Sequence, residues 1–410
     1  MGKDNVRRNF QEDIKLRGLK DLKVVLLHDW LTGFRGGERV FEALCEIFPN
    51  APIYTLFYTP GSTSPQIENR PIFTSFLNKL PGVHRYYRML LPLYPLAIRM
   101  LKIPQETQLV VSSSHCVIKG VTSGSRSFTY KHVSYIHSPM RYIYDQFDNY
   151  FGKKSGASFL EKIVGRLIRS YLETFDACSN DRIDLMIANS NFVRERIRRY
   201  YRRDAEVVNP FVELSDFERV RKDPPRRENF MVMVTAFAPN KRTDLAILAF
   251  KKLFREATNG SERNLVLKII GSGQQEKMLR RLAKGVKNIH FLGNLPRNSI
   301  IGLLSRAQAL IFPGVEDFGI VPLESLAAGT PVIAYRAGGV LETLNERVAI
   351  FFDEDNPDSL LRAIRSFIAR ADRATEENPL FDRQVLFQQA ELFSKMVFKN
   401  KISSLIAKVL

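Results

Sequence analysis

The 410-residue sequence has few cysteines, and their spacing is not typical of a metal site. Its three cysteines, Cys45, Cys116 and Cys178, are scattered along the chain. They are predicted to be small, buried hydrophobic residues in a reducing compartment. This pattern argues against a disulfide-stabilised fold.

The sequence also lacks a long apolar run. No stretch reaches the ~18 residues that a membrane-spanning helix requires. The nearest, residues 89–101, is broken by Pro92 and Pro95 and contains Arg99. The polar residues 1–20 have no apolar core of the kind found in signal peptides and are predicted to form a tail. We therefore expect a cytoplasmic protein.

What remains is the composition of a folded protein with a strong positive charge. Hydrophobic residues make up 45% of the chain and charged residues 25%, and a length of this order predicts two or three domains. The formal net charge is +18. A surplus of this size favours anionic partners, whether nucleic acid, anionic lipid or phosphorylated substrates, without choosing among them.

Short strand patterns alternate with helical patterns along most of the chain. Continuous runs of β-branched residues and leucine predict buried parallel strands, and helical periodicity follows several of them. The predicted strands are residues 22–30, 51–58, 107–114, 132–138, 184–190, 230–236, 264–273, 288–294, 308–314 and 331–335. The predicted fold class is therefore α/β with parallel sheets.

The alternation is interrupted once, at residues 204–230. Pro210, Pro224, Pro225 and clustered charges there predict a domain boundary. The predicted parts are an N-terminal domain over residues 21–210, a second domain over 211–385, and C-terminal helices over 386–410.

Two glutamates, Glu316 and Glu324, stand eight positions apart with little reactive chemistry between them. Ligands of open parallel sheets bind beyond the carboxyl ends of the strands, and Glu316 follows the predicted strand 308–314. A helix is predicted from Val321, with Pro322 at its first position and Glu324 in its first turn. Two carboxylates on either side of free helix amides suit a ligand with diols at both ends and a diphosphate between them, such as a nucleotide-diphosphate sugar. The alternative is an ordinary helix with an acidic first turn.

This stretch resembles the signature of the family 4 retaining glycosyltransferases of the GT-B fold, in which seven residues separate two glutamates and "FG" follows the first. Further segments resemble the family in the same order, namely residues 28–42, 110–121, 135–145, 187–197 and 238–250. Together they are most similar to the mannosyltransferases that assemble bacterial O-antigens and exopolysaccharides. The resemblance implies two Rossmann-like domains facing across a cleft, the N-terminal one for the acceptor and the C-terminal one for the nucleotide sugar. It also implies that the C-terminal helices return to the N-terminal domain.

The resemblance assigns donor-binding roles to individual residues. Glu316 would hold hydroxyls of the donor sugar, Glu324 would hold the ribose, and Lys241, with Arg242 beside it, would neutralise the diphosphate. Ala236 stands where many relatives have an arginine. Backbone close to the sugar and diphosphate would come from Gly36, Gly37, Phe318, Gly319, Ile320 and Val321.

The remaining assigned residues lie in the N-terminal half. His137 matches a histidine near the reacting centre, although a lone histidine after a strand is also a common structural residue. His115, Lys119 and Arg141 are predicted to serve the acceptor. The basic and apolar residues 77–102 are expected either to contact a membrane face or lipid-diphosphate acceptor, or to pack as a core segment with basic flanks.

The predicted function is transfer of a hexose from a nucleotide-diphosphate sugar to a lipid-linked or polysaccharide acceptor in cell-envelope glycan synthesis. GDP-mannose is the favoured donor and a UDP-sugar the alternative, and neither a metal nor a cofactor is expected. A nucleotide-sugar epimerase, a phosphorylase and a nucleic-acid-binding protein are the competing hypotheses.

Three other signals are given structural interpretations. The "GSG" at 271–273 is an incomplete dinucleotide fingerprint. Asp353 and Asp355 resemble a metal-binding pair but precede Asn356 and Pro357, which signal the start of a helix. The basic run over residues 194–203 is predicted to be a solvated helix face without nucleic acid.

Overall fold

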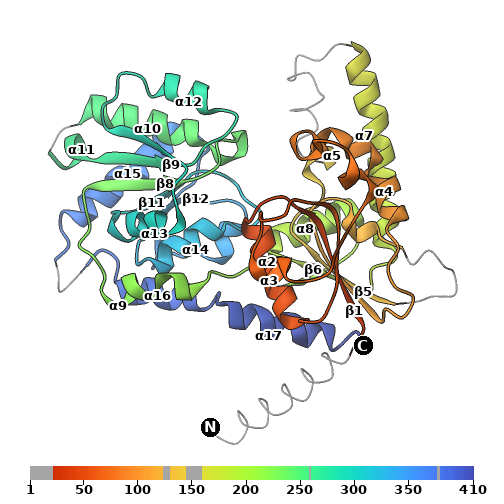
Figure 1. Ribbon diagram of the computed structural model, residues 1–410. Coiled ribbons are helices and arrows are strands. Elements are labelled where there is room, and N and C mark those ends of the chain that lie inside the picture. The colour runs from red at the N-terminus through yellow and green to blue at the C-terminus, as the bar shows by residue number, and fades with distance from the viewer. Residues whose placement is uncertain (1–21, 123–129, 145–158, 258–259, 376–378) are drawn as a thin grey trace, which may run out of the picture. The chain divides into compact units, whose positions relative to one another are not determined.

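The computed structural model describes residues 22–122, 130–144, 159–257, 260–375 and 379–410. The predicted tail, residues 1–20, lies outside them. The chain divides into two compact units (Figure 1). Unit 1 comprises the chain up to Asn209 together with Phe398–Leu410, and unit 2 comprises Pro210–Val397. The passage from unit 2 back to unit 1 therefore occurs inside one helix, α17 (Lys395–Ile406).

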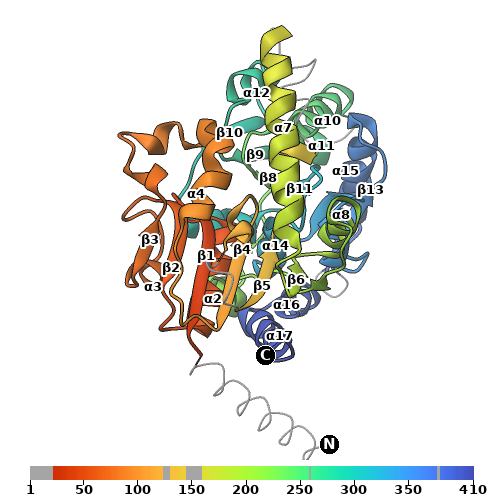
Figure 2. The same cartoon turned by 90° about the vertical axis from the view of Figure 1, so that its right-hand side faces the viewer.

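Unit 1 is built on a seven-stranded parallel sheet with the order β3-β2-β1-β4-β5-β6-β7, most of which can be followed in Figure 2. Its strands are β1 (Val24–Leu31), β2 (Ile53–Tyr58), β3 (Ile72–Thr74), β4 (Leu109–Ser114), β5 (Lys131–Ile136), β6 (Leu185–Ala188) and β7 (Glu206–Val207). The central strands are buried throughout because helices cover both faces. Successive strands are added toward one edge of the sheet from β1 to β3 and toward the other edge from β4 to β7. The position between β1 and β4 is therefore the switch point, where ligands of such sheets bind.

The helices of unit 1 cover its sheet on both sides. Helix α2 and the end of α17 pack on one face, where Lys399 Nζ lies 3.1 Å from Glu46 Oε2. Helices α4 and α7 pack on the other face around Phe175 and Tyr94. The helix bounds are α2 (Gly36–Ile47), α3 (Pro65–Glu68), α4 (Tyr94–Met100), α5 (Arg141–Tyr144), α7 (Phe159–Asn180) and α8 (Asn191–Tyr201).

Unit 2 repeats the plan with a six-stranded parallel sheet, β10-β9-β8-β11-β12-β13. Its strands are β8 (Phe230–Val234), β9 (Val266–Ile270), β10 (Ile289–Gly293), β11 (Leu310–Phe312), β12 (Val332–Tyr335) and β13 (Ala349–Phe352). Helices α10, α12 and α15 cover one face, and α13, α14 and α16 cover the other (Figure 1). The bounds are α9 (Glu218–Lys222), α10 (Thr243–Glu256), α11 (Gly260–Asn264), α12 (Glu276–Leu282), α13 (Arg297–Arg306), α14 (Ile320–Ala327), α15 (Pro357–Ala371) and α16 (Arg383–Glu391). The switch point of this sheet lies between β8 and β11.

The predicted α/β class with two parallel sheets is confirmed, and each of the ten predicted strands overlaps an observed strand. Three short strands, β3, β7 and β13, were not predicted, and neither was the 22-residue helix α7. The helix-start signal is confirmed, since the Asn356 side chain accepts a hydrogen bond from Ser359 N at 2.9 Å and Pro357 begins α15. Within the described part of the chain, none of the helices combines the length and the apolar character needed to cross a bilayer.

Part of the segment 77–102 packs in the core, as the second of the two alternatives predicted. Leu77, Val83, Tyr94 and Ile98 are buried in the core of unit 1. Large apolar side chains in and next to the same segment are nevertheless exposed: Phe73, Phe76, Leu80, Met89, Leu93, Leu96 and Met100. The segment folds as three 3₁₀ helices, Phe76–Lys79, Val83–Arg85 and Tyr87–Leu93, followed by α4.

Glycines allow the loops at the carboxyl edge of the unit 2 sheet to touch one another. A Cβ on Gly314, after β11, would lie 2.6 Å from Asn240 O in the loop after β8. A Cβ on Gly339, after β12, would lie 2.2 Å from Asp317 O. The Gly339 amide donates a 2.9 Å hydrogen bond to Glu316 O. The loop that carries Glu316 is therefore held between its neighbours by backbone contact.

Gly339→Ala is expected to lower the free energy of unfolding by about 1–3 kcal/mol, because the added methyl forces the loop at 316–318 to move. Urea unfolding measures the change. Gly302→Ala is the matched control, since nothing lies within 4 Å of its Cβ position inside α13, and alanine there is expected to stabilise the helix slightly. Equal stability of Gly339→Ala and the wild type would contradict the packing described.

Candidate functional site

Lys241 and Glu316 form an ion pair at the switch point of unit 2. Lys241 ends a 3₁₀ turn in the loop after β8, and Glu316 lies in the loop after β11. Lys241 Nζ lies 2.5 Å from Glu316 Oε1, and the two side chains are 24% and 20% exposed. The structure thus brings together two residues that the sequence predicted to act on the same ligand, and both remain accessible.

The loop after Glu316 leads directly into the N-terminus of α14. Gly319 adopts a φ of 86°, which favours glycine, and caps the helix. The helix begins at Ile320 rather than Val321, and Pro322 occupies its third position rather than its first. Proline costs nothing there, because the amides of the first turn have no partner within the helix. Ile320 and Val321, the first two residues of the helix, are partly exposed.

Glu324 lies deeper than the prediction of a first-turn position implies. It is the fifth residue of α14 and is 8% exposed. Arg297, at the start of α13, pairs with Glu324 and also with Asp216, whose Oδ2 lies 2.9 Å from Arg297 Nη2. The prediction missed Arg297, and no local sequence signal marks it, since its partners are distant in the chain.

Arg242 is held by two carboxylates beside α10. It adopts a left-handed backbone conformation with a φ of 51° at the start of that helix. Its guanidinium pairs with Asp355 and lies 3.4 Å from Asp244 Oδ1. Asp353 pairs with Arg336. The two aspartates that resembled a metal motif thus have arginine partners, and no metal-binding group of three or more His, Cys, Asp or Glu side chains occurs among the described residues.

In unit 1 the corresponding edge of the sheet gathers histidines. His137 follows β5, and its Nε2 lies 2.8 Å from Ser113 Oγ on β4. A Cβ on Gly37, at the start of α2, would lie 3.9 Å from the His137 ring. The backbone of His137 is fixed from both sides by Ser114 O and by the Asn189 side chain. Burial holds the pKa of His137 well below its ordinary value, so the ring is neutral at pH 7.

Asp29, at the carboxyl end of β1, organises the loop after β4. Its two carboxylate oxygens accept hydrogen bonds from four consecutive amides, His115 to Ile118, at 2.7–2.9 Å. The His115 ring lies beside Asp29 and edge-on to Trp30, with 28% of its side chain exposed. Burial lowers the pKa of His115, and the charge of Arg141 adds to that effect.

Lys119 does not fit the acceptor role predicted for it. It is 1% exposed, its Nζ lies 2.5 Å from Asp176 Oδ1, and it stands over the Tyr201 ring. A buried ammonium with a buried carboxylate partner is a structural element of the core. The prediction placed Lys119 by topology and had no means of seeing Asp176, 57 residues away.

The prediction also missed His28, Asp29, Glu38 and Ser113. The first two had a visible signal, since "HD" ends an otherwise apolar strand, and polar residues at that place face the ligand edge of a parallel sheet. Ser113 has the same position on β4.

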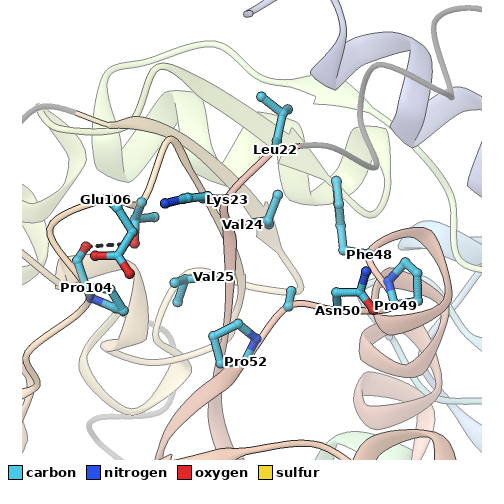
Figure 3. Close-up of a pocket in the computed structure, with 12 residues that line it drawn as sticks. Leu22, Lys23, Val24, Val25, Phe48, Pro49, Asn50, Pro52, Pro104 and Glu106 are labelled. Carbon is cyan, nitrogen blue, oxygen red and sulfur yellow. Dashed lines mark hydrogen bonds between the residues drawn. The ribbon is translucent and has the colours of Figure 1, made fainter.

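A hollow of about 330 Å³ lies at the other end of the unit 1 sheet, beside the amino end of β1 (Figure 3). Val24, Val25, Pro49, Pro52 and Pro104 contribute much of its lining. The hydrogen bond drawn there joins Thr107 Oγ1 to Pro104 O at 2.8 Å and belongs to a turn. Since ligands of such sheets bind at the carboxyl edge, we place the candidate site at the loops of that edge and not in this hollow.

A family model and two curated proteins match parts of the chain. Residues 215–378 match the family model described as Glycosyl transferases group 1. The chain is 26% identical over 231 residues to the human alpha-1,3/1,6-mannosyltransferase ALG2, covering 51% of this chain and 55% of that protein. It is 28% identical over 228 residues to a GDP-mannose-dependent alpha-(1-6)-phosphatidylinositol dimannoside mannosyltransferase of Mycobacterium tuberculosis, covering 52% and 58%. The chain thus spans just over half the length of these curated relatives.

Solved structures match over nearly the whole chain. The crystal structure of Anabaena Alr3699/HepE in complex with UDP and glucose aligns with a TM-score of 0.62 at 14% identity, covering 94% of this chain and 99% of that one. At this identity the match concerns the fold. The family model thus matches unit 2 residues 215–378, and the two parallel-sheet units have the GT-B fold.

Proposed function

We propose that the protein is a retaining hexosyltransferase that uses a nucleotide-diphosphate sugar, with GDP-mannose as the favoured donor. The observation that carries the proposal is the accessible Lys241–Glu316 pair beside the N-terminus of α14. Two relatives with mannosyltransferase names, one of them named as GDP-mannose-dependent, support the choice of mannose. The acceptor in this proposal is a lipid-linked or polysaccharide glycan of the cell envelope.

The donor site follows from the charges in unit 2. The diphosphate binds where the amides of Ile320 and Val321 and the ammonium of Lys241 converge, because helix N-termini and cations both stabilise phosphate. The carboxylate of Glu316, released from Lys241, accepts hydrogen bonds from sugar hydroxyls. Glu324 accepts from the ribose, with Arg297 fixing its orientation.

The proposed chemistry is displacement on one face of the sugar. The bond from the anomeric carbon to the diphosphate oxygen breaks, and the acceptor oxygen bonds to the same face. The acceptor proton passes to the departing diphosphate oxygen. Lys241 and the amides of α14 stabilise the negative charge that develops on the leaving group. The proposal includes neither a metal nor a cofactor.

The competing functions predict different requirements for acceptor, phosphate or nucleic acid. A nucleotide-sugar epimerase would convert the donor without any acceptor, and a phosphorylase would require inorganic phosphate. A nucleic-acid-binding protein would bind DNA or RNA in a salt-dependent way and would ignore nucleotide sugars. The positions of Lys241 and Glu316 beside the N-terminus of α14, where a phosphate is proposed to bind, favour the transferase over the nucleic-acid binder.

GDP-mannose is expected to raise the melting temperature of the wild type by mass action, in a thermal-shift series with GDP- and UDP-sugars. Glu316→Ala is expected to bind the donor about 10–100-fold more weakly, since a hydrogen bond to a charged group is worth about 1.5–3 kcal/mol. Glu256→Ala is the matched control, because this glutamate is also paired with a cation, Arg365, but lies at the far end of α10. If no nucleotide sugar stabilises the wild type, the donor site is wrong, and equal stabilisation of Glu316→Ala refutes the role of Glu316.

We further propose that unit 1 docks on an anionic membrane through a basic apolar surface. This surface comprises the exposed apolar side chains of residues 73–100 and the exposed cations Lys79, Arg85, Arg88, Arg99 and Lys102. No acidic residue occurs between Glu68 and Glu106. Apolar groups among cations, in a segment without carboxylates of its own, suit the interface of a bilayer that carries anionic headgroups. The proposal places the protein at the cytoplasmic face of a membrane, where a lipid-linked acceptor is available.

The wild type is expected to co-sediment with vesicles that contain phosphatidylglycerol and not with vesicles of phosphatidylcholine alone. Replacing Lys79 and Arg85 by glutamate is expected to weaken binding by at least about 30-fold, since each cation near the surface contributes about 1 kcal/mol. Met89→Ser removes an 80% exposed methionine and should weaken binding as well, whereas Met396→Ser, at a 70% exposed methionine of α17, should not. Binding that is insensitive to the changes at 79, 85 and 89 would refute this surface.

A further inference from the structure

Three aromatic side chains of unit 1 form a cluster at the carboxyl end of β1. The Trp30 ring lies edge-on to the His115 ring with the two ring centroids 4.4 Å apart, and its centroid lies 5.6 Å from that of Tyr87. All three side chains are partly exposed. The other residues of β1 are buried, so Trp30 is the place where this strand reaches the surface.

The polar atoms of this cluster are not used within the protein. Among the residues that the structure describes, none is hydrogen-bonded to the Trp30 indole N–H, to the Tyr87 hydroxyl or to His115 Nε2. The other ring nitrogen of His115 lies 3.4 Å from Asp29 Oδ2. An indole N–H and a phenol usually find a partner when they are buried, so these partly exposed groups are available to a polar ligand.

Aromatic rings with unpaired polar atoms at their edges suit a sugar. The apolar face of a sugar ring packs on an aromatic ring, and its hydroxyls bond to polar groups around it. A hydroxyl both donates and accepts, so it suits either tautomer of His115. Burial lowers the pKa of His115, and the ring is therefore neutral at pH 7 and suits a hydroxyl better than a phosphate. The cluster also lies at the switch point between β1 and β4, where ligands of parallel sheets bind.

The cluster borders the basic apolar surface of residues 73–102. Tyr87 begins the 3₁₀ helix Tyr87–Leu93. The guanidinium of Arg88, an exposed residue, lies 5.5 Å from the centroid of the Tyr87 ring. Met89, the next residue, is 80% exposed. One short segment thus contributes an aromatic ring to the cluster, and a cation and an apolar side chain to the surface.

We propose that Trp30, Tyr87 and His115 bind the sugar next to the lipid phosphate of a membrane-anchored acceptor. The sugar ring packs on the aromatic rings, and its hydroxyls bond to their unpaired polar atoms. The lipid and its phosphate stay with the apolar groups and cations of the basic apolar surface. This inference rests on the proposed function, and it selects a lipid-linked acceptor over a soluble polysaccharide.

Trp30 is the only tryptophan of the chain, so tryptophan fluorescence of the full-length protein reports on this cluster directly. The probes are octyl glycosides of mannose, glucose, galactose and N-acetylglucosamine, each below its micelle concentration and without any nucleotide sugar. At least one glycoside is expected to change the Trp30 emission with saturation, whereas 1-octanol is not. Equal responses to 1-octanol and to the glycosides, or no response to any glycoside, would overturn the proposal.

Two adjacent tyrosines provide a matched pair of variants. Tyr87→Phe is expected to weaken glycoside binding about 2–10-fold, the equivalent of one neutral hydrogen bond. Tyr86→Phe is the control and is expected to leave binding unchanged, since the Tyr86 hydroxyl already donates to Pro81 O at 2.9 Å. Trp30 emission follows binding in both variants, and equal affinities of the two would refute the role of Tyr87.

Trp30→Phe keeps an aromatic ring and removes the indole N–H. It is expected to weaken glycoside binding by a similar factor in isothermal titration calorimetry, and unchanged binding would refute the role of the N–H. Saturable glycoside binding by a protein that no nucleotide sugar stabilises would instead count against the proposed function alone.

Discussion

The contact between Lys241 and Glu316 depends on how closely two backbones approach at the switch point of unit 2. A Cβ on Gly314 would lie 2.9 Å from the Lys241 Cα, so glycine at this position lets the loop after β11 lie against the loop after β8. Gly338 and Gly339, in the loop after β12, let the backbone of that loop contact residues 316–318. The two charged side chains are therefore placed by backbone packing, and the helix terminus beside them is placed by the same contacts. In the proposed function, an anion at this site meets the N-terminus of α14 in a fixed position, and Lys241 turns from Glu316 to the phosphate; a pre-oriented helix terminus is a condition for strong electrostatic stabilisation.

Unit 1 uses the same sheet architecture for a different kind of site. At the carboxyl edge of its sheet, Asp29 accepts hydrogen bonds from four amides of one loop. The same edge contains His28, His115 and His137, which contact hydroxyl or carboxylate groups. Burial keeps the His137 and His115 rings neutral at pH 7. In the proposed function, unit 2 supplies charge for the diphosphate, whereas unit 1 supplies neutral hydrogen-bonding groups for hydroxyls. In the further proposal, the basic apolar surface at residues 73–102 docks on a membrane that carries the lipid-linked acceptor.

Much of the fold was visible in the sequence, because buried parallel strands are continuous apolar runs and leave a strong pattern. Some short strands left none, as β7 and β13 show, although β6, β11 and β12 are as short and were predicted. Pro322 was used to predict the start of α14, and the prediction of Val321 differs from the observed start, Ile320, by one residue, although the proline occupies the third position of the helix. Side-chain partners were harder to predict, since they depend on contacts between distant segments. Asp176 makes Lys119 structural and Arg297 holds Glu324, and neither pairing has a local signal. His28 and Asp29 were predictable in principle, as polar residues that end an apolar strand.

The central claim is that a nucleotide-diphosphate sugar binds at the carboxyl edge of the unit 2 sheet, between Lys241 and the N-terminus of α14. A crystal structure of the protein with GDP-mannose tests it most directly. We expect density for the diphosphate at the amides of Ile320 and Val321, with Lys241 turned from Glu316 to the phosphate and Glu316 bonded to sugar hydroxyls. Density for the nucleotide at another place, with the Lys241–Glu316 pair still intact, would contradict the claim.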